Sequence, residues 1–98
     1  MLKITRVACY CRVSTEEQKK HGYSISAQKE RLQQYVISHS DYMLVDFYVD
    51  DGVSAVKLAK RLELQRLLED VRHNKIDLIL FTKLDRWGRS VRIYHKIQ

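Results

Sequence analysis

Short runs of mostly apolar residues recur along the chain and are separated by stretches that mix polar and apolar positions. The runs cover residues 4–11, 43–49 and 76–82. Apolar runs of this length are typical of strands that are covered on both faces, as in a parallel sheet. The turn signal Asp50-Asp51-Gly52 directly follows the second run. We therefore expect three strands at these positions.

Two of the intervening stretches follow helical spacing. Residues 25–38 carry apolar side chains on one stripe, and Ser24 or Ser26 is the expected N-cap. Leucines and a valine between 64 and 71 recur at i, i+3, i+4 and i+7, which predicts an amphipathic helix. Asn74 follows as a candidate for a left-handed helix end.

The strands and helices alternate, and a further helix is expected to begin at about Ser90. This order predicts the α/β class: three layers, with a mostly parallel sheet, helices on both faces and right-handed crossovers. A length of 98 residues fits one domain or part of one. Because the last helix has neither a stop signal nor a following strand, we expect residues 1–98 to be the front part of a longer protein.

The balance of charges narrows the class of partner. The chain has 18 Lys and Arg against 12 Asp and Glu, and a formal net charge of +6. This excess favours a polyanion, either nucleic acid or an acidic membrane surface. No apolar run has the length of a membrane span, and the first residues lack the apolar core of a secretory signal. We therefore expect a cytoplasmic protein without a membrane anchor.

Candidate chemistry gathers in the loops that follow the strands. Sites in open parallel sheets form beyond the carboxyl ends of the strands, so these loops are expected to share one edge. The candidates are Arg12, Ser14 and Gln18 in the first loop, Asp50, Ser54 and Arg61 in the second, and Asp85, Arg86 and Arg89 in the third.

Arg12 and Ser14 end the first strand and share a side of it with Tyr10, because side chains alternate along a strand. A cation beside a hydroxyl suits chemistry on a phosphate, since arginine binds two oxygens and stabilises developing charge. Taken alone, the pair is better explained by a surface arginine and by a serine that caps a turn or helix.

A basic cluster near the end of the chain favours phosphate chemistry at Arg12 and Ser14 over the surface and capping roles. Arg86 and Arg89 are expected near the start of the last helix, with Arg92 and Lys96 on the same face. Such a run is usually a solvated helix face. However, the helix dipole disfavours cations at helix starts, where Arg61 is also expected, and a bound phosphate would remove this conflict.

Other reaction classes lack their motifs. The chain contains neither a dinucleotide fingerprint nor a P-loop, and its carboxylates and cysteines form no metal-ligand cluster. Its histidines fall outside the three loops, which leaves a Ser-His-Asp mechanism without an obvious base. Cys9 and Cys11 are expected to be small buried packing residues.

Together the motifs resemble those of the serine recombinases, the family of resolvases, invertases and the large serine integrases or transposases. The resemblance covers essentially the whole chain, and the run after Ser24 is more similar to the large members. The matching segments are Tyr10-Cys11-Arg12-Val13-Ser14-Thr15 with Gln18, Ser24-Ile25 with Gln28, Asp50-Asp51-Gly52-Val53-Ser54, Arg61, and Lys83-Leu84-Asp85-Arg86-Trp87-Gly88-Arg89-Ser90.

The resemblance implies a resolvase-like catalytic domain and a role for each matched residue. Ser14 would attack a DNA phosphodiester and form a phosphoserine link, followed by strand exchange and religation. Asp85 would position arginines or take part in proton transfer. The scissile phosphate would be surrounded by Arg12, Arg61, Arg86 and Arg89. Supporting roles would fall to Tyr10, Gln18, Gln28, Asp50 and Ser54, and further DNA contacts to Arg92 and Lys96.

The resemblance also implies the partners. The family needs no metal and no cofactor, acts on double-stranded DNA, and works as dimers and DNA-bound tetramers. The oligomerisation helix and the DNA-binding domains are expected beyond Gln98, so this chain alone is expected to be inactive.

Two alternatives belong to other classes. One is a catalytically silent relative of the same fold that only binds DNA or assembles. The other is a flavodoxin-like or receiver-like module, although a receiver needs an acidic cluster where this chain has arginines.

Overall fold

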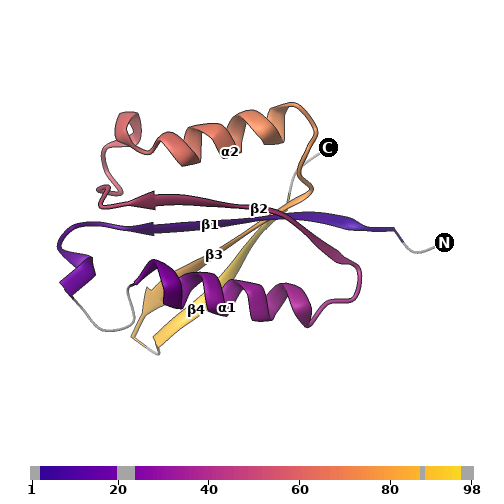
Figure 1. Ribbon diagram of the computed structural model, residues 1–98, viewed down its shortest axis with the longest axis horizontal. Coiled ribbons are helices and arrows are strands. Elements are labelled where there is room, and N and C mark those ends of the chain that lie inside the picture. Colours follow the sequence, from indigo (N-terminus) through magenta and orange to yellow (C-terminus); the bar gives the residue numbers. More distant parts are fainter. Residues whose placement is uncertain (1–2, 20–23, 87, 96–98) are drawn as a thin grey trace.

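A sheet of four strands lies between two helices in the computed structural model, which describes residues 3–19, 24–86 and 88–95 (Figure 1). α1 covers one face of the sheet and α2 the other (Figure 1). This arrangement confirms the three-layer α/β class. Neither helix has the length and apolar character needed to cross a membrane in the described part of the chain. The elements are β1 (Thr5–Val13), η1 (Glu17–Lys19), α1 (Ile25–Ile37), β2 (Tyr42–Asp51), η2 (Leu58–Lys60), α2 (Leu62–Arg72), β3 (Leu78–Asp85) and β4 (Gly88–His95), of which η1 and η2 are 3-10 turns.

β1 is the central strand of the parallel part of the sheet. It pairs in parallel with β2 on one side and with β3 on the other, in the strand order β2-β1-β3-β4. Strands with a common direction end at a common edge, and Figure 1 shows the arrowheads of β1, β2 and β3 on the same side of the molecule. The register places Arg12 opposite Asp50. The loops after these strands therefore share one edge, as expected.

The last segment is a strand, and the helix expected from about Ser90 is wrong. β4 pairs antiparallel with β3, and Asp85 lies opposite Gly88 across the turn. Residues 90–94 read Ser-Val-Arg-Ile-Tyr, in which β-branched and aromatic side chains favour a strand. Val91 packs against the core on the α1 side. Pairing with β3 and this packing outweigh the helical spacing of the basic residues.

This correction changes the setting of the basic cluster. Arg86 lies in the turn between β3 and β4, and Arg89 and Arg92 belong to β4. The helix-dipole argument therefore does not apply to Arg86 or Arg89. Lys96 lies outside the described residues.

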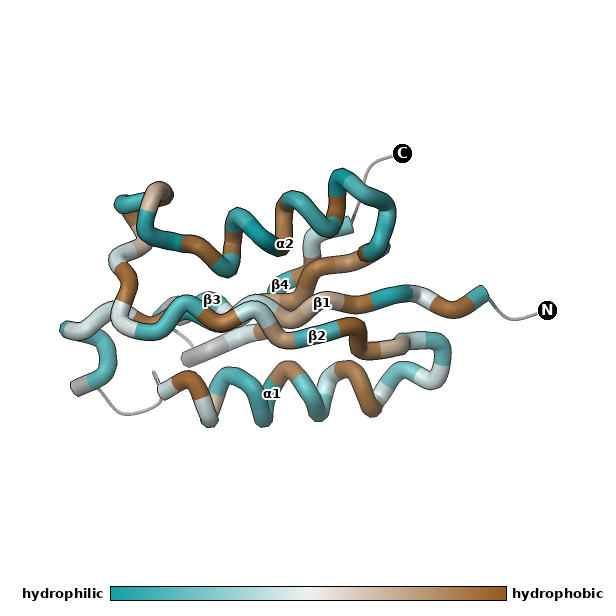
Figure 2. The backbone as a smooth tube through the Cα atoms, turned by 45° about the horizontal axis from the view of Figure 1, so that its top comes forward, coloured by the Kyte–Doolittle hydropathy of each residue, from teal (hydrophilic) through white to brown (hydrophobic). Residues whose placement is uncertain are grey.

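Apolar side chains pack on both faces of β1, because alternate residues of a strand point to opposite faces. Cys9 and Cys11 join Leu32 of α1 in one cluster. Tyr10 joins Leu67 of α2 in the other. Figure 2 shows hydrophobic residues concentrated along β1 and β3, whereas hydrophilic and hydrophobic residues alternate along both helices. The two cysteines are free and buried, which confirms their predicted role as packing residues.

α1 begins at a capping serine. The hydroxyl of Ser24 accepts a hydrogen bond from the Ala27 amide at 3.1 Å, which satisfies one of the amides left unpaired at a helix start. Buried residues then recur every fourth position, at Gln28, Leu32 and Val36. Of the two serines expected as N-caps, Ser24 is the one used.

α2 is capped by a residue from another element. Arg61 stands at the N-cap position and makes no capping hydrogen bond with its side chain. Instead the carboxylate of Asp50, at the end of β2, accepts hydrogen bonds from the amides of Glu63 at 3.0 Å and Leu64 at 3.1 Å. At the other end, Asn74 has a φ of 61°, the left-handed conformation expected of it. The negative charge of Asp50 at the start of α2 also complements the helix dipole.

Replacement of the buried leucine of α2 tests the packing of this helix. We expect Leu67→Ala to lower the free energy of unfolding by about 2–5 kcal/mol, because it removes buried methyl groups and leaves a cavity. Urea denaturation followed by circular dichroism measures the change. Leu68→Ala is the matched control, since Leu68 is 46% exposed, and we expect a loss of less than about 1 kcal/mol. Equal losses would contradict packing through Leu67.

Replacement of Asp50 tests the capping of α2. Asp50→Ala leaves a phenol and two amides without their acceptor, so we expect the free energy of unfolding to fall by about 1–3 kcal/mol. Asp51→Ala removes the same charge from an exposed neighbour and should change stability by about 0.5 kcal/mol or less. Thermal melts of both variants make the comparison. An Asp50 variant as stable as the Asp51 variant would show that α2 does not depend on this carboxylate.

Candidate active site

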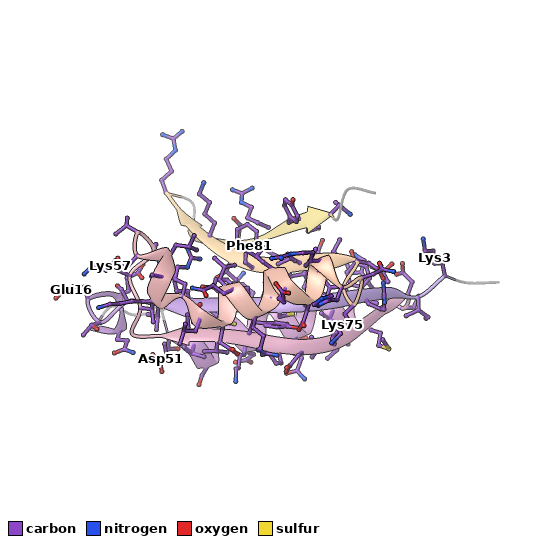
Figure 3. The ribbon with its side chains drawn as sticks, turned by 90° about the horizontal axis from the view of Figure 1, so that it is seen from above. Lys3, Glu16, Asp51, Lys57, Lys75 and Phe81 are labelled. Atoms are coloured by element: carbon purple, nitrogen blue, oxygen red, sulfur yellow. The ribbon has the colours of Figure 1, made fainter. Side chains whose placement is uncertain are left out.

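A cavity of about 660 Å³ opens beside the carboxyl ends of β1 and β3. Leucines of α2 and apolar residues of β3 form one part of its wall. The other part is polar and contains Tyr10, Arg12, Glu17, Gln28, Arg61 and Lys83. Figure 3 shows Glu16, Asp51 and Lys57 at this end of the molecule, with Lys3 and Lys75 at the other. Residues from the first two predicted loops therefore come together here.

Arg12 and Ser14 converge on one oxygen atom of Glu17. The Ser14 amide donates a hydrogen bond to Glu17 Oε1 at 3.0 Å. Arg12 Nη2 lies 3.1 Å from the same oxygen. In return, the Glu17 amide donates to Ser14 Oγ at 3.1 Å. The nucleophile candidate, its nearest arginine and a carboxylate thus form one compact group.

This group keeps Glu17 ionised. Burial alone would raise the pKa of the Glu17 carboxyl, but the hydrogen bonds from Ser14 and the charge of Arg12 outweigh it and lower the pKa below its usual value. The reciprocal bonds between Ser14 and Glu17 are those of a capping box, here at the start of η1. Ser14 is therefore a cap, as one interpretation of the sequence held, and it also lies beside a guanidinium group.

Gln28 and the second loop hold Arg12 from two sides. The buried amide of Gln28 accepts from the Arg12 amide at 3.2 Å and donates to the Arg12 carbonyl at 2.9 Å. Arg12 Nη1 donates to the Val53 carbonyl at 2.8 Å. The bend that brings this loop near is made at Gly52, where φ is 75° and an L side chain would be strained. The backbone and the side chain of Arg12 are both fixed before any ligand binds.

Arg61 reaches the same cavity through a chain of hydrogen bonds. Its Nε donates to the Tyr10 hydroxyl at 3.1 Å, and that hydroxyl donates to Asp50 at 2.7 Å. Arg61 Nη1 also donates to the Ala55 carbonyl at 3.1 Å. Burial and the hydrogen bond to Asp50 raise the pKa of Tyr10 to about 12. Tyr10 therefore stays a neutral phenol at physiological pH and orders Arg61 instead of acting as a base.

Two further residues expected in supporting roles make local contacts. Gln18 donates its side-chain amide to Asp51, and its backbone amide bonds to the Ser14 carbonyl at 3.1 Å. Gln18 thus ties the loop after β1 to the end of β2. The Ser54 hydroxyl accepts from the Val56 amide at 3.3 Å. Ser54 does not line the cavity, so its described contact shapes the loop only.

Among the candidates of the third loop, Arg86 has a described side chain. Arg86 is exposed in the hairpin turn and does not line the cavity. Arg92 is also exposed, on β4. The side chains of Asp85 and Arg89, like all of Lys96, lie outside what the structure describes. Lys83 of β3 does line the cavity, so the cation that this strand contributes there is a lysine.

Sequence reasoning missed Glu17 and Lys83 as parts of the site. Glu17 carried a usable signal, since a serine followed three residues later by glutamate is the capping-box pattern. Lys83 begins the last segment that matches the family and ends an expected strand, but it was given no role. Among the described residues, no group of three or more histidine, cysteine or acidic side chains is placed to hold a metal ion.

Comparisons with known proteins agree with this fold. The fold is similar to that of the N-terminal catalytic domain of TP901-1 integrase, with a TM-score of 0.70, 41% sequence identity, and coverage of 88% of this chain and 62% of that one. A protein of Bacillus phage phi105, named uncharacterized immunity region protein 3, is 59% identical over 49 residues, which are 50% of this chain and 58% of that protein. The chain thus spans about three fifths of either relative.

The family assignment rests on nearly the whole chain. Residues 7–98 match the family model described as "Resolvase, N terminal domain". Together with the integrase likeness, this match confirms the resemblance to the catalytic domains of serine recombinases, the large type included. The chain belongs to the resolvase N-terminal domain family.

Proposed function

We propose that this chain supplies the nucleophile of a site-specific DNA recombinase, and that Ser14 attacks a DNA phosphodiester. The observation that carries the proposal is the arrangement at Ser14. A guanidinium nitrogen of Arg12 and the Ser14 amide both lie within 3.1 Å of one carboxylate oxygen. Such a pair of donors binds a phosphate oxygen as readily as a carboxylate oxygen.

The proposed step exchanges one phosphate ester for another. The Ser14 Oγ–P bond forms while the bond from phosphorus to the 3′ oxygen of the DNA breaks. The serine gives up its proton, and the departing 3′ oxygen gains one. Negative charge grows on the phosphate oxygens in the transition state, where arginines placed in advance stabilise it. Religation is the same step reversed, so bond energy is conserved and no energy cofactor is required.

Arg12 and Arg61 are the described cations best placed for this role. Both line the cavity. Arg61 is held by neutral groups, a carbonyl and a phenol oxygen. Arg12 donates to a neutral carbonyl oxygen and is also paired with the Glu17 carboxylate. Neutral acceptors orient a guanidinium group without cancelling its charge. Gln28 and Asp50 act one step away, by fixing Arg12 and Tyr10.

The remaining roles follow from the family. Arg86 and Arg89 would join Arg12 and Arg61 around the phosphate, and Asp85 would orient arginines or transfer a proton. Arg92 and Lys96 would contact the DNA backbone. Double-stranded DNA and further copies of the protein are the proposed partners, and the cytoplasm is the proposed location. We propose that the 98 residues act only as part of a DNA-bound assembly.

Covalent trapping tests this function. The full-length protein, with any DNA-binding domains that follow Gln98, is incubated with duplex DNA fragments and quenched in denaturant. The adduct is then digested for mass spectrometry. We expect the DNA on the peptide that contains Ser14. Ser14→Ala should abolish the adduct because no other oxygen occupies that place, whereas DNA binding should stay within a few-fold.

Ser38→Ala is the matched control. Ser38 is exposed and stands at the C-cap of α1. Its described hydrogen bonds are made to residues of α1 and to His39. This variant should form the adduct as the wild type does. DNA attached elsewhere, or an adduct that survives Ser14→Ala, would exclude Ser14 as the nucleophile. Intact DNA binding with no adduct in any variant would favour a catalytically silent module.

A further inference from the structure

The carboxylate of Glu17 occupies the position that an anionic substrate would need. We propose that Glu17 is an internal substitute for the phosphate, which holds the donors of Arg12 and Ser14 and must be displaced before DNA can bind there. The inference rests on the proposed function, since it takes the same donors as the phosphate site. It assigns Glu17 a role that neither the family motifs nor the charge pattern indicates.

The contacts of Glu17 are those expected of a bound oxyanion. Glu17 Oε1 accepts from a charged guanidinium nitrogen and from a backbone amide, at 3.1 and 3.0 Å. Both groups belong to the segment that carries the nucleophile. Arg12 already uses Nη1 on the Val53 carbonyl, so Nη2 is the nitrogen that it presents to Glu17. A phosphate oxygen that seeks the same nitrogen therefore competes directly with the carboxylate.

Glu17 is placed so that an incoming anion can replace it. Its side chain is 28% exposed and lines the cavity together with Arg61 and Lys83. An anion entering the cavity meets those two cations beside the Arg12–Glu17 pair. The side chain belongs to the short η1 turn and not to a buried strand or a long helix. It can leave by rotation about its own bonds, without any rearrangement of the sheet.

Displacement of the side chain leaves the serine ready to react. The hydrogen bond that Ser14 Oγ accepts comes from the backbone amide of Glu17, not from its carboxylate. A hydroxyl oxygen has two lone pairs, so one can accept this bond while the other faces phosphorus. The carboxylate departs and the backbone bond continues to orient the hydroxyl. Glu17 thus has two separable parts. Its backbone amide positions Ser14, and its side chain occupies Arg12 Nη2 and so hinders phosphate from binding there. We call this side chain the guard.

The charge of the carboxylate determines the strength of the guard. Ionised Glu17 neutralises Arg12 and repels a second anion. A single phosphate then gains little by entering, because it loses the Glu17 interaction as it gains its own. A larger set of cations, such as one completed by Arg86 and Arg89, would shift the competition toward DNA. The guard therefore favours reaction in an assembled complex over attack on stray phosphate.

Phosphate binding by charge variants tests the guard. The 98-residue chain is titrated with inorganic phosphate at neutral pH and constant ionic strength, and the amide signals of residues 14 and 17 are followed by ¹⁵N NMR. Glu17→Gln keeps an oxygen for the Ser14 amide but removes the charge that competes for Arg12. We expect it to bind phosphate about five-fold tighter than the wild type, as for loss of one nearby charge at a partly exposed site.

Two further variants sharpen the comparison. Glu16→Gln removes the same charge from the preceding, exposed residue, and we expect its affinity to change by less than two-fold. Glu17→Asp keeps the charge but shortens the side chain, which draws its oxygen away from both donors. This variant should bind phosphate with intermediate affinity. Unchanged or weaker phosphate binding by Glu17→Gln would overturn the proposal. An equal gain for Glu16→Gln would also overturn it, since only the overall charge would then matter.

A separate variant distinguishes failure of the guard from failure of the function. Arg12→Gln should lose most phosphate binding if Arg12 is a ligand of the anion. If Arg12→Gln binds weakly while Glu17→Gln matches the wild type, Glu17 is no guard and the phosphate site stands. If Arg12→Gln and the wild type bind phosphate equally well, the anion does not use this site, and both proposals fail.

Discussion

The buried carboxylate of Asp50 connects the fold to the site. It ends a strand, caps α2 through two backbone amides and accepts the Tyr10 hydroxyl. Through Tyr10 it also determines where Arg61 points. A carboxylate that is 4% exposed is costly to bury unless donors surround it. Here three donors do so, and each belongs to an element that the site needs.

The parallel sheet explains how short loops can form such a site. Because β1, β2 and β3 run in one direction, their ends supply Arg12, Asp50 and Lys83 to one edge without long excursions of the chain. The loop after β2 then serves both cavity-lining arginines at once. Its carbonyl at Val53 accepts from Arg12, and its carbonyl at Ala55 accepts from Arg61. One loop thus sets the spacing of two cations contributed by separate elements.

Local patterns in the sequence were enough to predict most of this framework. The apolar runs located β1, β2 and β3, and leucine spacing located α2, because burial on one or both faces leaves a period in the sequence. The nearness of Arg12, Asp50 and Arg61 then followed from topology alone. β4 was missed because its stability comes from pairing with β3, whereas the Arg92–Lys96 spacing matches a helix. Asp50 as the cap of α2 was missed for a similar reason, since the carboxylate and the helix lie on different elements.

The arrangement of charge around Ser14 explains why a site rich in arginine remains stable without a ligand. Arg61 is held by neutral oxygens and keeps its charge, with the Tyr10 ring 5.4 Å away as a further favourable contact. Arg12 lies close to Ser14, the proposed nucleophile. Of the two arginines, Arg12 is the one paired with a carboxylate, that of Glu17 in the same loop as Ser14. Two unpaired guanidinium groups in one cavity would repel each other and weaken the fold. A carboxylate on a short turn relieves that repulsion. If it is exchanged for a phosphate, as we propose, the stability of the free protein and its affinity for phosphate depend on the same pair of donors.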